Sequence, residues 1–286
     1  MLVLTHEEIE RRRDRIYHRN RLLQVTSIEA SLDFINEVGF CFAFAAKNSE
    51  LPCLWHAACG QRNPVMPKHT HHDPHVSLVW QAKDVLPAQK KVYYGKVLKK
   101  RPTFISLDYF PAFYRLIAGD RGPDSYLAEF IDGTLSLPAR NILNALSALS
   151  PQITRDLKMA SGMAHPKQRH EFDQAMAELQ TKMFIVKIGE FYDPFTFLWD
   201  LVPNRFSEEV AQSQSLNETQ AYMSILEKYF QNVLVSNEIQ IQRMFGWPKG
   251  LILRKLEELL DKKFIIGDVK IENEKGVWYA HKSVLT

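Results

Sequence analysis

"AELQTKMFIVKIGE" (177–190) returns 80 residues later as "EELLDKKFIIGDVK" (257–270). The two copies share a Glu-Leu pair, a lysine and a Phe-Ile pair at equivalent positions. Each copy joins the end of a helix, with apolar residues at helical spacing, to a strand rich in β-branched residues. The match raises the question of whether the flanking sequences are duplicated as well.

The sequence around the second copy predicts three helices followed by two strands. Residues 216–233 and 248–263 have apolar residues at helical spacing, and a short helix between them would end at Gly246. Two strands follow, joined by "ENEKG", in which Gly276 can adopt a positive φ. Helix, helix, helix, strand, hairpin, strand is the element order of a winged helix, a form of the helix-turn-helix.

The sequence around the first copy predicts the same order. Helices are expected over 137–150, 152–163 and 166–183, and paired strands on both sides of "EFYDP" (190–194). We therefore predict a mainly α protein with small β-hairpins, an α+β fold of tandem winged-helix modules. The predicted segments are an N-terminal region, a winged-helix module, a linker and a C-terminal winged-helix module, at 1–135, 136–203, 204–215 and 216–286.

The N-terminal region is less regular than the two modules. A helix is expected between Ser27 and Gly39, a strand in "FCFAFAA" (40–46), and a helix after Pro87. A degenerate third helix-turn-helix unit with a basic face is one interpretation of this region.

Composition excludes several classes of protein. The chain has 286 residues and a formal net charge of +3, and no apolar run is long enough for a membrane span. The first residues lack the apolar core of a signal peptide. Three cysteines fit a reducing compartment better than a disulfide framework, so we predict a cytoplasmic protein.

Basic clusters predict a surface that binds double-stranded DNA. Two clusters lie in the N-terminal region, and the second is interleaved with Tyr93 and Tyr94, which either stack on bases or pack in the core. A winged helix would also place the start of its third helix in the major groove. The candidate residues are Arg12, Arg15 and Arg19; Lys90, Lys91, Lys96, Lys99, Lys100 and Arg101; Lys167, Gln168, Arg169 and His170; and Lys249, Arg254 and Lys255. The alternative is that these charges form solvated helix faces.

Cysteine and histidine residues gather between 53 and 75, in "CLWHAAC" and "HTHHDPH". The Cys-x2-His-x2-Cys spacing differs from that of standard structural zinc sites. We interpret the segment as a His-rich surface loop and expect no metal and no other cofactor. Gly-x-Ser-x-Gly and Walker motifs are absent from the sequence.

The stretches "EVGFCFAF" (37–44) and "LPAQKKVYYGKVLKKRPTFIS" (86–106), with winged-helix modules after them, resemble the bacterial alkylpurine and crosslink-repair DNA glycosylases. The resemblance implies winged helices around a basic channel and metal-independent hydrolysis of the N-glycosidic bond of damaged purines. Active members carry Gln-x-Gln or Gln-x-Asp just after a helix and a glycine, where this chain has Phe40-Cys41-Phe42-Ala43-Phe44.

This departure leaves no residue that we assign as catalytic; Asp33 and Glu37 would serve only in a different register. We predict a DNA-binding, DNA-repair-related protein without the family's catalytic motif. The alternatives are a glycosylase for alkylated or crosslinked bases and a winged-helix transcription regulator.

Overall fold

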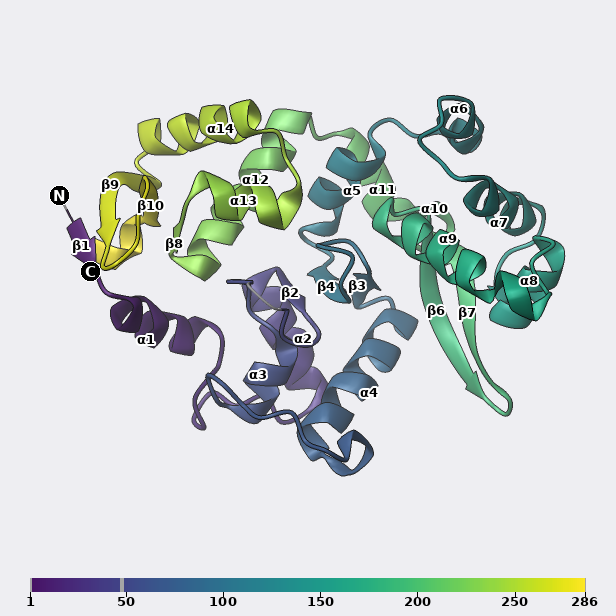
Figure 1. Ribbon diagram of the computed structural model, residues 1–286, viewed down its shortest axis with the longest axis horizontal. Coiled ribbons are helices and arrows are strands. Elements are labelled where there is room, and N and C mark those ends of the chain that lie inside the picture. The colour runs from purple at the N-terminus through teal and green to yellow at the C-terminus, as the bar shows by residue number, and fades with distance from the viewer. Residues whose placement is uncertain (1, 47–48, 286) are drawn as a thin grey trace. The chain divides into compact units, whose positions relative to one another are not determined.

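The computed structural model describes residues 2–46 and 49–285, which form a mixed α+β fold of helices and small sheets (Figure 1). Two compact units are present: residues 1–82 with 219–286, and residues 83–218. The elements are β1 (Leu2–Leu4), α1 (His6–Ile16), α2 (Ile28–Val38), β2 (Phe40–Phe42), α3 (Leu54–Cys59), η1 (Thr70–His72), α4 (Pro74–Ala88), β3 (Val92–Gly95), β4 (Thr103–Ser106), α5 (Phe110–Ala118), α6 (Ser125–Ile131), α7 (Leu137–Ala148), β5 (Gln152–Ile153), α8 (Thr154–Ala160), η2 (Pro166–Gln168), α9 (Arg169–Thr181), β6 (Ile185–Tyr192), β7 (Phe195–Leu201), α10 (Val202–Arg205), α11 (Ser207–Gln214), α12 (Glu218–Val233), β8 (Val235–Ser236), α13 (Glu238–Phe245), α14 (Lys249–Asp261), β9 (Ile265–Ile271), β10 (Trp278–His281) and η3 (Lys282–Leu285).

The C-terminal segment has the winged-helix order α12, β8, α13, α14, β9, β10. Its strands lie in the order β9-β10-β8, and the hairpin between β9 and β10 contains Gly276 at φ 100°. The Asn237 side chain accepts a hydrogen bond from the Gln240 N–H at the start of α13, and left-handed Gly246 ends that helix. Local capping therefore fixes the turn between α13 and α14.

The N-terminal strand β1 adds a fourth strand to this sheet. It pairs in parallel with β9, Leu2 opposite Val269 and Leu4 opposite Ile271, so the two chain ends lie close together (Figure 1). Thr5 then starts α1 with a capping box: the Thr5 hydroxyl accepts a hydrogen bond from the Glu8 N–H, and the Glu8 carboxylate accepts one from the Thr5 N–H. This pairing could not be predicted, because three apolar residues specify neither a partner nor a register.

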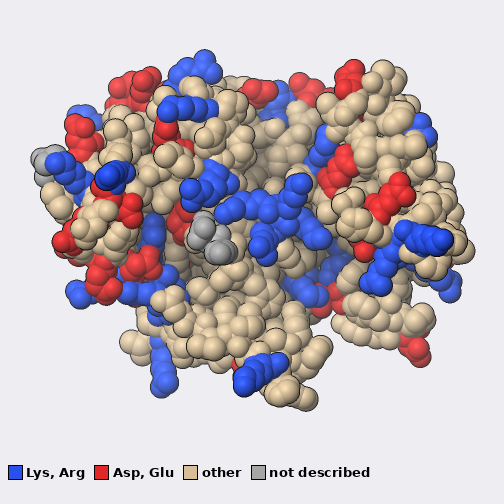
Figure 2. Space-filling model, in the orientation of Figure 1, with Lys and Arg blue, Asp and Glu red and all other residues tan. Residues whose placement is uncertain are grey.

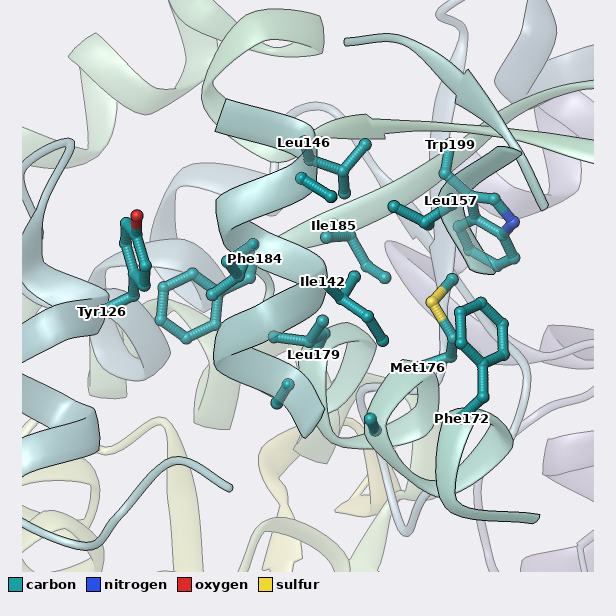
Figure 3. Close-up of a cluster of buried hydrophobic side chains, with 14 of the residues drawn as sticks. Tyr126, Ile142, Leu146, Leu157, Phe172, Met176, Leu179, Phe184, Ile185 and Trp199 are labelled. Atoms are coloured by element: carbon teal, nitrogen blue, oxygen red, sulfur yellow. The ribbon is translucent and has the colours of Figure 1, made fainter. Parts of the chain in front are cut away.

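Residues 137–201 have the same order, α7, β5, α8, α9, β6, β7, with strands arranged β5-β7-β6. Their core is built by the predicted helical stripes and the two long strands (Figure 3). It includes Ile142, Leu143 and Leu146 of α7; Phe172, Met176 and Leu179 of α9; and Ile185 and Trp199 of β6 and β7.

The repeated stretch of sequence corresponds to one repeated backbone turn. Two residues after its third helix, each module has a residue at positive φ, Met183 at 54° and Lys263 at 52°. The next residue then donates its N–H to the carbonyl five positions back: Phe184 to Leu179, and Phe264 to Leu259. This turn satisfies carbonyls at the end of the helix and leads directly into the strand.

The N-terminal region contains the same turn and the same element order, α2, β2, α3, α4, β3, β4. Lys90 has φ 56°, and the Lys91 N–H bonds the Leu86 carbonyl. We infer a third winged-helix unit here. The expected helix after Pro87 was wrong, because α4 ends at Ala88 and the β-favouring residues 92–95 form β3, paired antiparallel with β4.

Residues 204–215, expected to link the modules, are largely helical. Phe206 is buried between α10 and α11, and α11 packs along α5 (Figure 1). Pro111 lies in the first turn of α5, where a missing N–H costs nothing.

Candidate nucleic-acid interface and a polar pocket

The tips of the β3–β4, β6–β7 and β9–β10 hairpins differ in chemistry. The loop between β3 and β4 carries the predicted basic residues Lys96, Lys99, Lys100 and Arg101. Val97 and Leu98 are buried and anchor this loop, while Lys100 and Arg101 are exposed. The tip is therefore a cationic loop on an apolar anchor.

The tip between β6 and β7 is aromatic. Phe191, Tyr192 and Phe195 are 51%, 73% and 58% exposed, which is unusual for large apolar side chains. The rings of Tyr192 and Phe195 lie 5.9 Å apart, and Phe197 continues the row 5.2 Å from Phe195. From the sequence, we expected "EFYDP" to form only a turn between strands. The three aromatic residues beside that turn are the signal that could have predicted an exposed aromatic tip.

The basic and aromatic hairpins lie side by side in one unit. Strand β3 contacts β6, and the Lys187 ammonium lies 5.9 Å from the centre of the Tyr94 ring. Lys187 also bonds Asp84 at 2.6 Å and Glu190 at 2.5 Å. These contacts fix the base of the aromatic hairpin to the end of α4.

The pKa values of Asp84 and Glu190, the two carboxyl groups that contact Lys187, shift in opposite directions. Burial, and then the hydrogen bond to Glu190, raise the pKa of Asp84. Burial opposes ionisation of Glu190 too, but hydrogen bonds from Asp84 and Lys187 outweigh it and lower its pKa to about 2. Glu190 is therefore charged at neutral pH and holds Lys187 as an ion pair.

The C-terminal hairpin and helix are less suited to phosphate. Glu272 and Glu274 are exposed on the hairpin. Lys249 pairs with Glu238 at 2.8 Å, whereas Arg254 is exposed. The prediction that Lys255 faces DNA was wrong: its side chain is buried and pairs with Glu258 at 2.7 Å, because its position on α14 faces the core.

The N-terminal arginines do not form one exposed face. Arg12 and Arg15 are exposed, and Arg12 donates to the Ser283 carbonyl at 3.1 Å. The Arg19 side chain is only 8% exposed and pairs with Glu10 and Asp14. Arg19 is therefore a structural residue, contrary to its predicted role at phosphate.

The other candidates are mostly at the surface. Lys91, Lys167, Arg169 and His170 are exposed and Gln168 is half-buried, whereas Lys90 is partly buried and lies 3.2 Å from Glu209. Tyr93 and Tyr94 pack against Phe110 and Phe104, so their base-stacking interpretation was wrong. In the face that Figure 2 draws, Lys and Arg side chains are spread over the surface, with Asp and Glu beside many of them.

A polar pocket of about 220 Å³ lies in the unit formed by residues 1–82 and 219–286. We name it the Glu50 pocket; its polar lining comprises Glu10, Arg13, Tyr17, Arg19, Ser49, Glu50, His56, Arg62 and Asn63. Its arginines are matched by acids: Arg13 and Arg19 bond Glu10, and Arg62 bonds Glu7 and Asp14. Among residues 2–46 and 49–285, Glu50 forms no such ion pair.

Glu50 is held instead by tyrosines. Its carboxylate accepts a hydrogen bond from Tyr229, and its carbonyl accepts one from Tyr17 at 2.6 Å. Burial raises the pKa of both hydroxyls, so they remain neutral donors. Burial, and then the charge of Arg19, lower the pKa of His56 to about 4, so its imidazole is neutral at pH 7. A carboxylate and a neutral imidazole in one pocket are the groups that general acid–base chemistry uses.

Arg13 connects α1 to the C-terminal module beside this pocket. Its guanidinium donates to the Val233 carbonyl at 2.8 and 2.6 Å and to Glu10 at 2.9 Å. We expect Arg13→Met to lower the free energy of unfolding by about 3 kcal/mol, because buried acceptors lose their donor. Urea unfolding checks this, with exposed Arg11→Met as the control, expected to change stability by about 0.5 kcal/mol or less. Equal losses in both variants would contradict the role of Arg13.

Residues 40–43, part of the stretch that the resemblance in sequence places at the expected catalytic position, lie in the core. Phe40, Cys41, Phe42 and Ala43 are fully buried, and β2 leaves no polar side chain in that stretch. Asp33 and Glu37 are exposed on α2, and Glu37 pairs with His18 at 3.0 Å. Both acids therefore lie outside this buried segment.

The His-rich loop does not form a metal centre in the described part of the chain. Nowhere in residues 2–46 and 49–285 do three or more His, Cys, Asp or Glu side chains converge as metal ligands would. The His71 and Trp80 rings are in contact, tilted by 52° with their centres 5.1 Å apart. None of the helices in the same residues has the length and hydropathy that a bilayer span requires.

The family model described as AlkZ related matches residues 25–246. The chain belongs to this family. Among solved structures, the Streptomyces sahachiroi DNA glycosylase AlkZ is similar, with a TM-score of 0.64 and 10% sequence identity over 100% of this chain and 71% of that chain. At this identity the likeness shows a shared fold. No curated protein matches the sequence. The predicted family relation and α+β class are thus confirmed.

Proposed function

We propose that this protein binds double-stranded DNA through residues 83–218 and recognises sites where the duplex is distorted. The observation that carries the proposal is the contact between two hairpins of one unit: strand β3 of the basic hairpin, whose tip has Lys100 and Arg101, contacts strand β6 of the hairpin with the exposed aromatic tip. Lysine and arginine bind phosphates whatever the sequence, and aromatic side chains stack on bases or wedge between them.

The aromatic tip favours distorted over intact DNA. Unstacking a base step costs a few kcal/mol in a regular duplex and least at a mismatched or damaged base. Phe191, Tyr192 and Phe195 would insert where that cost is already reduced. The start of α9, with Lys167, Arg169 and His170, would add contacts, since a winged helix uses its third helix together with its hairpin.

The family, and the fold shared with a protein described as a DNA glycosylase, support a role in DNA repair as part of this proposal. Free cysteines at 41, 53 and 59 fit the reducing cytoplasm, where we place this function.

Salt-dependent binding tests the proposal. Replacing Lys100 and Arg101 together with glutamine should weaken binding to duplex DNA and reduce the slope of log K against log salt by about 2, since each phosphate contact contributes about 0.9. Exposed Lys270 and Lys275 of the C-terminal hairpin, replaced in the same way, serve as the matched control and should leave the slope unchanged. An unchanged slope in the first variant, or a strong preference for one operator sequence, would contradict the proposal.

Base hydrolysis is a second candidate function, favoured by the Glu50 pocket. Glu50 has tyrosine hydroxyls as partners and no paired cation among the described residues, so its carboxylate is available to activate a water molecule. Incubation of the intact chain with alkylated duplex DNA, followed by analysis for released base, tests this function. No release above the spontaneous rate would eliminate it and leave the DNA-binding proposal standing.

A further inference from the structure

A second cavity, of about 570 Å³, lies within residues 83–218 and is not part of the interface proposed above. Its floor is apolar and buried, formed by Leu143 and Leu146 of α7 together with Phe184. Its other walls come from the end of α5, the start of α6, and helices α10 and α11. Cavities of about 300–1,000 Å³ with such walls are typical of small-molecule sites.

The charges at this cavity are already compensated. Arg121 lies flat on the Phe184 ring, 3.6 Å from its centre, and bonds Glu129 at 2.8 Å and the Lys182 carbonyl at 2.8 Å. Asp124, exposed at the rim, is the other charged residue of the lining. One cation and one anion give the lining no net charge, which disfavours a phosphate or another anion as the ligand.

Hydrogen-bonding groups remain among the residues that line the cavity. The Asn204 amide group donates to Ser150 at 2.9 Å and to Asp200 at 3.0 Å, so its oxygen is left as an acceptor. Ser147 and Gln214 also line the cavity, and within residues 2–46 and 49–285 their side chains have no hydrogen-bond partner. A ligand with both a donor and an acceptor at one edge would satisfy them.

We propose that this cavity binds an uncharged, flat heteroaromatic molecule. Its apolar faces would lie against the Leu143, Leu146 and Phe184 floor, and its polar edge would face Ser147, Asn204 and Gln214. Such a ligand would join α7 of the winged helix to α10 and α11, and its binding would raise the melting temperature of the protein by mass action.

Fluorescence titration of the intact chain with N-phenyl-1-naphthylamine, an uncharged probe that brightens in apolar sites, tests the cavity. We expect saturable binding of one probe per chain and at least about tenfold weaker binding in Ser147→Trp, whose indole would occupy the cavity. Ala148→Trp is the matched control: residue 148 is exposed on the same turn of α7 but does not line the cavity, so its affinity should stay within about twofold. Unsaturable binding of the probe, or an equal loss of affinity in both folded variants, would overturn the proposed site.

Displacement of the probe tests the ligand class. Quinazolin-4-one, a flat uncharged molecule with an N–H and a carbonyl at one edge, should displace the probe competitively. Naphthalene-2-sulfonate, of similar size but charged, should not. The assignment is overturned if quinazolin-4-one fails to displace, or if the sulfonate displaces as well.

Discussion

Replacing Tyr192 and Phe195 with alanine should lower affinity for a duplex containing a mismatch or an abasic site by about 30-fold or more. Stacking of a base on an aromatic side chain is worth about 1–3 kcal/mol, so the loss of two rings corresponds to at least about 2 kcal/mol. The rings are exposed at the hairpin tip, and Lys187, Glu190 and the strand pairing below them remain, so the fold should be unaffected. Fluorescence anisotropy with labelled duplexes measures the effect.

The controls for this experiment distinguish base stacking from nonspecific apolar binding. Affinity for intact duplex should fall less, because phosphate contacts supply most of that binding. Val277→Ala with Ile239→Ala removes exposed apolar side chains from the C-terminal module and should leave both affinities unchanged. A similar loss of affinity for intact and distorted DNA would show that the aromatic tip does not distinguish the two.

Glu50→Gln should lower base release from alkylated DNA by about 10²- to 10⁴-fold if the Glu50 pocket is hydrolytic, the effect typical of removing a general base. Glutamine has the same shape and can still accept the bond from Tyr229, but it cannot take a proton from water at neutral pH. Single-turnover analysis of released base measures the rate.

Exposed Glu37→Gln is the matched control for this variant and should retain the rate of the intact chain. DNA affinity of Glu50→Gln should be unchanged, since Glu50 belongs to neither hairpin tip. Full activity in Glu50→Gln would remove Glu50 from the chemistry while leaving the binding proposal intact.

Much of the architecture could be predicted because it is local. Helix caps, apolar helical stripes and the turn after the third helix depend on neighbouring residues. Asn237 and Gly246 therefore predicted the start and end of α13, and the 177–190 repeat predicted the helix-to-strand junction. The helix expected after Pro87 failed because the segment 89–101 mixes helix-favouring lysines with strand-favouring Val92, Tyr93 and Tyr94. The pairing of β3 with β4 then decided between them.

The candidate sites could be predicted only in part. Charge at the β3–β4 tip is visible in the sequence, but Arg19 and Lys255 look the same there as exposed cations, and their burial depends on which helix face meets the core. Glu50, Tyr17 and Tyr229 are separated by up to 212 positions, and nothing local relates them.

The sequence by itself thus determined the repeated helix-and-hairpin units and the family, because helical periodicity, caps and left-handed turns are encoded within about a dozen residues. Tertiary structure alone decided that β1 joins β9, that the basic hairpin lies beside the aromatic one, and that Glu50 faces a pocket with tyrosine partners. Those arrangements depend on the packing of apolar surfaces that are far apart in the chain, and packing chooses among partners that look equivalent in sequence.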